Sequence, residues 1–262
     1  MSKTVVDRLE DRRLDPYRSL KTASLHRRAG LFIAEGDKVV ERLLVSDFEV
    51  VSVLVSERRV SSLGNLERPG LEVLIIPERL ATELVGFKFH AGTMACGRRK
   101  PPPDLTTLAT AALVVGCASV DDPENLGSII RHCAAFGVGG LVLGPGCADP
   151  YSRRVIRVSM GNGFRLPILE ASDLMSDLLR LKNEHGFQLI ATVLDQEAEP
   201  VRGAIVPDRA VILFGNEAHG LEPGLVEICD RRLTIPMHSA ADSLNVAVAA
   251  ALILHEFSPF GV

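Results

Sequence analysis

Polar residues in the second half of the sequence occur in three short groups, each following a predicted strand. In parallel α/β sheets, ligands bind beyond the carboxyl ends of the strands. Amide, carboxylate and guanidinium groups at such an edge can orient a substrate, bind a phosphate or stabilise developing negative charge. The residues concerned are Asn125 and Arg131, then Gly215, Glu217 and Gly220, and finally Ser243 and Asn245.

Arg131 in the first group needs a partner more than any other residue there. It lies six positions after Asn125, inside an apolar helix predicted for residues 126–136. Because a buried unpaired guanidinium is costly, Arg131 requires either a ligand or a carboxylate such as Asp121 or Asp122. Asn125 is suited to cap the same helix by accepting from its free N–H groups. On spacing alone, a capped helix with a structural ion pair explains the pattern as well as a ligand site does.

The second group places one carboxylate between two glycines. Gly215 and Gly220 bracket Glu217 directly after a buried strand predicted at 211–214. Glycine allows the backbone to turn sharply or to approach a ligand closely. Taken by itself, a tight turn that carries an exposed acid is the simpler interpretation.

The third group opens the last helix of the chain. Ser243 and Asp242 are both good N-cap residues, which explains either of them without a ligand. Asn245 in the first turn is less easily explained, because asparagine is a poor helix former. Its amide is therefore a candidate for contact with a ligand.

The elements that position these groups alternate between strand and helix along the chain. Apolar runs that are nearly continuous predict parallel strands covered on both faces, and the helices between them imply a layered α/β arrangement. The final helix is apolar nearly all round, so it is expected to be buried in a core or an interface. Strands are predicted at 50–55, 71–76, 111–115, 141–143, 189–194, 211–214 and 233–235, and helices at 35–46, 78–85, 126–136, 172–185, from Pro223, and at 243–257.

A proline-rich segment divides the chain. Three consecutive prolines flanked by charges at 98–104 favour an extended, solvated linker. We therefore predict an α/β domain at 1–97 and a second domain at 105–262, each large enough to hold its own core.

Composition restricts the classes of function. The 262 residues are 47% hydrophobic, and their formal net charge is −4, so a nucleic-acid partner requires a local basic patch. Five scattered cysteines without a CxxC pair argue against a disulfide framework and a structural zinc site, and for a cytoplasmic location. The N-terminus has no apolar secretory region, and the longest apolar run is too short to span a membrane.

Two other enzyme classes fit the sequence poorly. The glycines at 137–140 and 144–146 suggest a dinucleotide-binding loop, but neither run forms GxGxxG between a strand and a helix. The seven histidines are dispersed and none forms HExxH, so neither a metal site nor a metal hydrolase is expected.

Taken together, the three groups resemble the SpoU/TrmH family of RNA 2′-O-ribose methyltransferases, in the SPOUT superfamily. The resemblance covers about residues 105–262 closely. The first 100 residues, through FIAEG at 32–36 and HAG at 90–92, are more loosely similar to a ribosomal-protein-like RNA-binding domain. The matching motifs are Asn125-x-Gly127-x-x-x-Arg131, Gly215-x-Glu217-x-x-Gly220-Leu221, and Ile235-Pro236-Met237 with Ser243-Leu244-Asn245.

The resemblance implies a fold, a cofactor and a set of site residues. The expected fold is a SPOUT domain with a parallel sheet and a C-terminal trefoil knot, preceded by a smaller α/β RNA-binding domain. The expected cofactor is S-adenosylmethionine, and the expected assembly is a homodimer formed through the C-terminal domain. The implied catalytic residues are Arg131, Asn125, Glu217, Ser243 and Asn245, and the implied cofactor-binding residues are Gly215, Ile235, Met237 and Leu244.

RNA contact requires basic side chains. Arg153 and Arg157 are four apart and would share a helix face that can follow phosphates. The other candidates are Arg154, Arg27 and Arg28. Ribosomal RNA is favoured over transfer RNA as the substrate because of the N-terminal domain. The alternative function is a non-catalytic RNA-binding protein that retains the fold.

Overall fold

The computed structural model describes residues 2–18, 23–60, 70–238 and 242–258. The chain forms two compact units, one made of 1–101 with 151–164 and the other of 102–150 with 165–262. The segment 151–164 lies in the part of the sequence predicted as the second domain, but it belongs to the first unit. Its helix places Ile156, and the turn after it places Phe164, in the apolar core of that unit.

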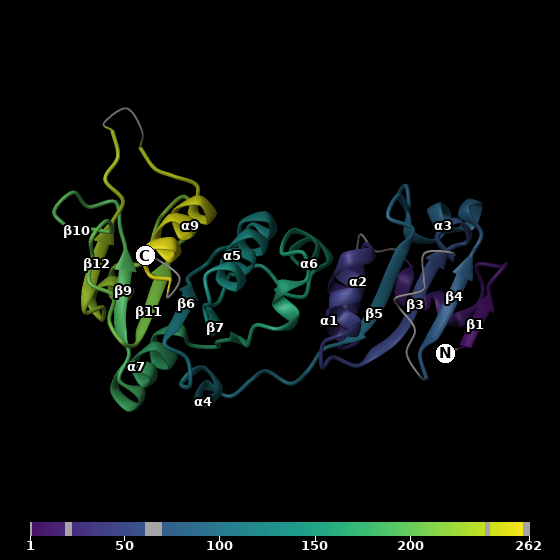
Figure 1. Cartoon of the computed structure of the whole chain (residues 1–262), viewed down its shortest axis with the longest axis horizontal. Coiled ribbons are helices and arrows are strands. Elements are labelled where there is room, and N and C mark those ends of the chain that lie inside the picture. Colours follow the sequence, from purple (N-terminus) through teal and green to yellow (C-terminus); the bar gives the residue numbers. More distant parts are fainter. Residues whose placement is uncertain (1, 19–22, 61–69, 239–241, 259–262) are drawn as a thin grey trace. The chain divides into compact units, whose positions relative to one another are not determined.

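The first unit is built on a mixed five-stranded sheet (Figure 1). The strands β1, β4 and β3 are parallel to one another, whereas β5 runs antiparallel to both β3 and β2. The strand β5 ends at Arg98, so the predicted linker begins one residue later than its sequence suggests. In spatial order the strands are β1 (Ser2–Val5), β4 (Glu72–Ile76), β3 (Val50–Ser56), β5 (Thr93–Arg98) and β2 (Leu31–Glu35).

Alternate residues of these strands bury two separate cores, as a sheet covered on both faces requires. Val53 and Val55 of β3 pack into a core shared with α2 (Asp37–Leu44) and α6 (Arg153–Val158). Leu54 points the other way, into a core shared with the 3₁₀ helix η1 (Arg12–Tyr17) and α3 (Glu78–Val85). A further helix, α1 (Ala23–Arg28), contacts β2.

The second unit is built on a seven-stranded sheet in which every pairing is parallel. The central strand β11 has five consecutive buried residues, which agrees with the apolar run predicted there. In spatial order the strands are β10 (Glu199–Pro200), β12 (Arg231–Thr234), β9 (Gln188–Thr192), β11 (Ala210–Phe214), β6 (Leu113–Cys117), β7 (Gly140–Leu143) and β8 (Ile168–Glu170).

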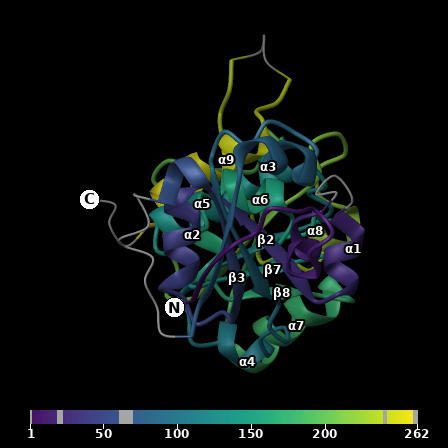
Figure 2. The same ribbon diagram turned by 90° about the vertical axis from the view of Figure 1, so that its right-hand side faces the viewer.

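Helices cover both faces of this sheet. The helices α4 (Leu105–Leu108), α7 (Leu174–His185) and α8 (Pro223–Glu227) share a core with β6, β7, β9 and β11. The helices α5 (Pro123–Ala135) and α9 (Val246–Glu256) pack against each other. Figures 1 and 2 both show α5 and α9 on one side of the sheet and α4 and α7 on the opposite side.

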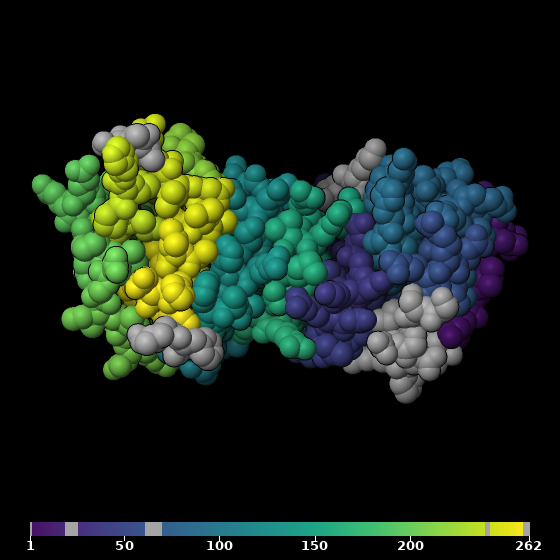
Figure 3. Space-filling view, turned by 45° about the horizontal axis from the view of Figure 1, so that its top comes forward, coloured from purple at the N-terminus to yellow at the C-terminus, as the bar shows by residue number. Residues whose placement is uncertain are grey.

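The last helix is only partly buried in its own unit. Val246, Ala247, Ala250, Ile253 and Leu254 are buried, whereas Val248 and Leu252 are 49% and 46% exposed. Figure 3 shows part of the C-terminal segment, in yellow, on the surface beside a teal segment from the middle of the chain. In the described part of the chain, no helix combines the length and apolarity needed to cross a membrane.

Candidate functional site

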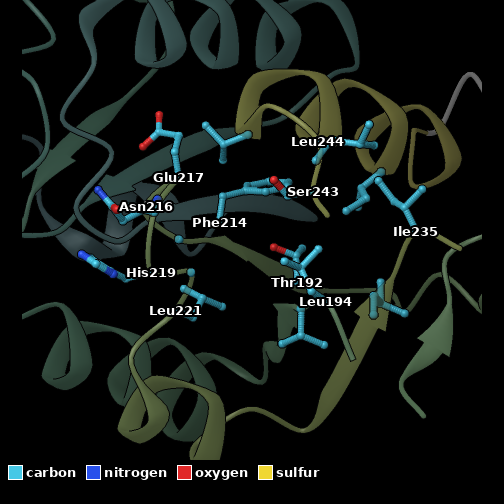
Figure 4. A pocket seen from close by; sticks show the side chains of 18 of the residues that line it. Thr192, Leu194, Phe214, Asn216, Glu217, His219, Leu221, Ile235, Ser243 and Leu244 are labelled. Atoms are coloured by element: carbon cyan, nitrogen blue, oxygen red, sulfur yellow. Dashed lines mark hydrogen bonds between the residues drawn. The ribbon is translucent and has the colours of Figure 1, made fainter. Parts of the chain in front are cut away.

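A cavity of about 500 Å³ lies at the carboxyl ends of three neighbouring strands, β9, β11 and β12. This is the edge at which parallel α/β sheets bind ligands. Figure 4 shows Phe214, Thr192 and Ser243 around its centre, with Glu217 on one side and Ile235 on the other. Four predicted site residues besides Glu217 and Gly215 line it, namely Ser243, Ile235, Met237 and Leu244.

The loop after β11 has a geometry that explains both of its glycines. Asn216 and Gly220 exchange two backbone hydrogen bonds, at 3.0 and 2.8 Å, and close a tight turn around Glu217. A Cβ at Gly215 would lie 2.2 Å from the carbonyl carbon of Gly220, so a larger residue cannot fit there. Gly220 has a φ of +69°, which glycine adopts readily. The prediction of a tight turn is confirmed, and the turn forms one wall of the cavity.

Asn216 anchors this loop, although it is not among the site residues predicted from the sequence. Its Nδ2 donates to the backbone oxygen of Ser119 at 2.9 Å, and its Oδ1 accepts from the backbone N–H of Ala218. Ser119 follows β6 and has a φ of +56°, a conformation that non-glycine residues rarely adopt. An asparagine two positions after a buried strand, between Gly215 and Gly220, is the signal that would have identified it.

Three predicted site residues form one hydrogen-bonded chain beside the cavity. The Nδ2 of Asn125 donates to Oε1 of Glu217, and the Nδ2 of Asn245 donates to Oδ1 of Asn125 at 2.8 Å. These residues come from α5, from the loop after β11 and from the start of α9. Segments that are far apart in the sequence therefore meet at one place, at the edge of the sheet where ligands bind.

Two helix caps differ from those predicted. Asp122, not Asn125, caps α5, because its carboxylate accepts from the backbone N–H groups of Glu124 and Asn125. Asn245, not Ser243 or Asp242, caps α9, because its Oδ1 accepts from Ala247 and Val248. Pro123 at the first position of α5 fixes the start of that helix. The amide of Asn125 is consequently available for Glu217 and Asn245.

Arg131 is placed differently from the other predicted catalytic residues. Its side chain is exposed on α5, and it is not among the described residues that line the cavity. It lies six positions after Asn125 on the helix, a rise of about 9 Å along the axis. The ion pair with Asp121 or Asp122 that the sequence allowed does not occur among the described residues. Its guanidinium therefore remains available to bind an anion.

His132, the neighbour of Arg131, lies between α5 and the start of α9. Burial lowers the pKa of His132, the charge of Arg131 lowers it further, and the backbone of Ala247 opposes the shift. Its Nδ1 is buried and has no hydrogen-bond partner in the described part of the chain. His132 at the contact between α5 and α9 is therefore less readily protonated than a histidine in water.

The predicted RNA-binding arginines have different surroundings. Arg153 forms an ion pair with the buried Glu35 at 2.5 Å and lies 4.4 Å from the ring centre of Phe87. Arg157 lines the same cavity of the first unit as Arg153, which agrees with the shared helix face that their spacing predicts. The remaining candidates, Arg154, Arg27 and Arg28, are exposed.

The fold is shared with solved RNA methyltransferases. The AdoMet-bound rRNA methyltransferase of Sinorhizobium meliloti superposes with a TM-score of 0.83 at 26% identity, covering 97% of each chain. The SpoU methyltransferase AviRb of Streptomyces viridochromogenes, in complex with the cofactor AdoMet, superposes with a TM-score of 0.80 at 27% identity. That match covers 95% of this chain and 97% of AviRb.

Sequence comparison identifies the family. The model of the SpoU rRNA methylase family matches residues 112–255. An uncharacterised tRNA/rRNA methyltransferase of Mycobacterium bovis is 38% identical over 258 residues, which cover 94% of this chain and 88% of that protein. The 23S rRNA (guanosine(2553)-2′-O)-methyltransferase RlmP of Bacillus subtilis is 30% identical, and the match covers 95% and 97% of the two chains. The chain belongs to the SpoU rRNA methylase family.

Proposed function

We propose that this protein transfers a methyl group from S-adenosylmethionine to a ribose 2′-hydroxyl of RNA, with ribosomal RNA as the favoured substrate. One observation carries the proposal: Asn125, Glu217 and Asn245 are hydrogen-bonded to one another beside a cavity at the carboxyl edge of a parallel sheet. The relative RlmP, which is named as a 23S ribosomal RNA 2′-O-methyltransferase, supports the choice of both the acceptor atom and the RNA.

The residues of the cavity suit S-adenosylmethionine. A volume of about 500 Å³ is within the range of small-molecule sites, roughly 300–1,000 Å³. Leu244, Ile235 and Leu221 provide apolar walls for an adenine ring, and the turn around Glu217 forms the wall opposite Ile235. Bound there, the cofactor would supply a methyl group on a positively charged sulfur. The names of the two AdoMet-bound structural relatives support this assignment.

The three linked side chains are suited to hold the target nucleotide. Glu217 is exposed, and Asn125 fixes its Oε1. Asn245 holds Asn125 in turn, so neither amide needs to reorganise when the substrate binds. Ser243 lines the cavity one residue before Leu244 and can hydrogen-bond a ribose hydroxyl.

Arg131 acts in this proposal as a charged group and not as a proton acceptor. A guanidinium stays protonated in proteins and is a poor base, but it binds phosphate in a bidentate way and stabilises developing alkoxide charge. Its exposure on α5 leaves it accessible to the phosphate beside the target ribose.

A homodimer through the second unit fits the surface of α9. Val248 and Leu252 are about half exposed, on a helix whose residues from Val246 to Leu254 are all apolar. Burial of such side chains between two copies would favour association. The trefoil knot implied by the family resemblance, the assignment of the first unit to RNA binding and the cytoplasmic location stay predictions.

Methyl transfer can be tested with unmodified transcripts of 23S ribosomal RNA and of transfer RNA. Each is incubated with the protein and S-adenosylmethionine, digested to nucleosides and analysed by mass spectrometry. We expect a 2′-O-methylated nucleoside from the ribosomal transcript. Methylation of a base would contradict the proposed acceptor, and RNA binding without any transfer would favour the non-catalytic alternative.

A further inference from the structure

A second cavity, of about 800 Å³, lies within the first unit. It is formed by the end of β2, the first turn of α2, the segment after α3, and α6 with Met160. The α6 segment is 118 positions away from β2 and α2 in the chain, and two contacts fix it there. Arg153 pairs with Glu35, and Arg42 donates to the backbone oxygen of Met160 at 2.6 Å.

Positively charged side chains outnumber negatively charged ones around this cavity. Four cations line it, Lys38, Lys88, Arg153 and Arg157, against the two carboxylates of Glu35 and Asp37. Arg153 neutralises the buried Glu35. Asp37 lies 3.5 Å from Arg59, which is not a lining residue. Three cations are therefore left facing the cavity without a balancing acid.

Those three cations are accessible. Lys38, Lys88 and Arg157 are exposed, and none of them forms an ion pair with another residue that the structure describes. Arg153 differs from them, because it is held between Glu35 and the ring of Phe87. Arg153 is therefore a structural part of the cavity wall. The groups that can bind an anion are Lys38, Lys88 and Arg157.

The backbone adds positive potential at the same place. Gly36 precedes α2 with a φ of +99°, and no side chain caps that helix. The first residues of α2 line the cavity, so N–H groups that have no acceptor within the helix are close to it. Together with the three cations, this arrangement favours a negatively charged ligand over a neutral one.

We propose that this cavity binds a phosphodiester of the RNA substrate, with Lys38, Lys88 and Arg157 as its side-chain contacts. The choice of RNA rests on the proposed function. Arg157 comes from α6, which lies in the sequence between β7 and β8, two strands of the second unit's sheet. RNA bound here would contact α2, the segment after α3 and α6, all of which belong to the first unit.

The test compares two double variants of the full-length protein. Lys88→Ala with Arg157→Ala removes two cavity cations, and Arg8→Ala with Arg79→Ala removes two exposed cations of the same unit that do not line the cavity. Binding to an unmodified 23S ribosomal RNA transcript is measured by filter binding at several salt concentrations. Each lost phosphate contact weakens binding roughly tenfold at 0.1 M salt and reduces the salt slope by about one.

We expect the cavity variant to bind this RNA at least about tenfold more weakly than the control variant, with a shallower salt slope. Both should keep the wild-type affinity for S-adenosylmethionine and the wild-type melting temperature. RNA binding by the cavity variant equal to that of the control overturns the inference, and so does equal weakening in both variants. Wild-type protein that binds the transcript but transfers no methyl group overturns the proposed function and leaves the cavity assignment in place. Wild-type protein that binds neither the 23S ribosomal RNA transcript nor a transfer RNA transcript overturns both the proposed function and the cavity assignment.

Discussion

Asn245 donates from Nδ2 to Oδ1 of Asn125 at 2.8 Å, although 120 positions separate the two residues in the chain. The same Asn245 caps α9 through its Oδ1, which accepts from the backbone N–H groups of Ala247 and Val248. The oxygen of this side chain therefore caps α9, and its nitrogen holds Asn125 in place at the site of the proposed reaction.

These two roles of Asn245 can be separated by substitution. Asn245→Asp keeps an N-cap oxygen but loses the donor to Asn125, so we expect near-native stability with methyl transfer reduced at least about tenfold. Asn245→Ala loses both and should also lower the free energy of unfolding by about 1 kcal/mol. Single-turnover transfer and urea denaturation measure the two effects. Full activity in Asn245→Asp would show that the amide donor has no part in the reaction.

Gly215 tests the role of the turn after β11 as a cavity wall. In Gly215→Ala the new Cβ meets the backbone of Gly220, and the loop must shift at a cost on the order of 1–3 kcal/mol. We expect the affinity for S-adenosylmethionine, measured by calorimetry, to fall by roughly tenfold or more.

The matched control for Gly215 is Gly203→Ala. Gly203 has a φ of +79° and open space around its Cβ position, so alanine there strains the backbone without changing the cavity. This control should lose stability and keep its cofactor affinity. Equal cofactor affinity in both variants would argue against the turn as part of the cofactor site.

Arg131 tests the division between cofactor binding and transfer. Arg131 does not line the cavity, so Arg131→Ala should bind S-adenosylmethionine as the wild type does. If it stabilises charge near the reacting ribose, transfer should fall by on the order of 10²–10³. Calorimetry and rate measurements on the same preparations give both quantities. A parallel loss of cofactor affinity and rate would contradict this role.

His132 gives the fold a pH dependence. Burial lowers its pKa below the usual value of about 6.5, so the folded protein binds this proton less readily than the unfolded chain does. Its contribution to stability is present above about pH 6.5 and is lost as the pH falls through the lowered pKa. Urea denaturation at pH 7.5 and 5.5 should show a larger acid-side loss in the wild type than in His132→Gln. Equal losses would show that His132 has no such effect.

The sequence predicts most of the second unit because its strands are apolar runs and its helices have clear starts and stops. The strands at 211–214 and 141–143 and the helix closed by Gly186 agree with the structure to within two residues. The groups around Asn125, Glu217 and Asn245 each follow a predicted strand, and these three residues form one hydrogen-bonded chain.

The remaining features depend on contacts that periodicity does not encode. Whether Asp122 or Asn125 caps α5 depends on Pro123, which fixes the first turn. The helix α6 belongs to the first unit because Ile156 and Phe164 find their apolar partners there, about 100 residues away in the chain. The strands β2 and β5 are antiparallel neighbours in the first unit's sheet, and their short apolar runs do not reveal that pairing.

The central claim is that the cavity at the ends of β9, β11 and β12 holds the methyl donor beside Asn125, Glu217 and Asn245. The most direct measurement is the electron density of crystals grown with S-adenosylmethionine. Density for the cofactor between the turn at Gly215–Gly220 and the side chains of Ile235, Met237 and Leu244 is the predicted result. A cofactor ordered anywhere else on the protein, with this cavity empty, would contradict the claim.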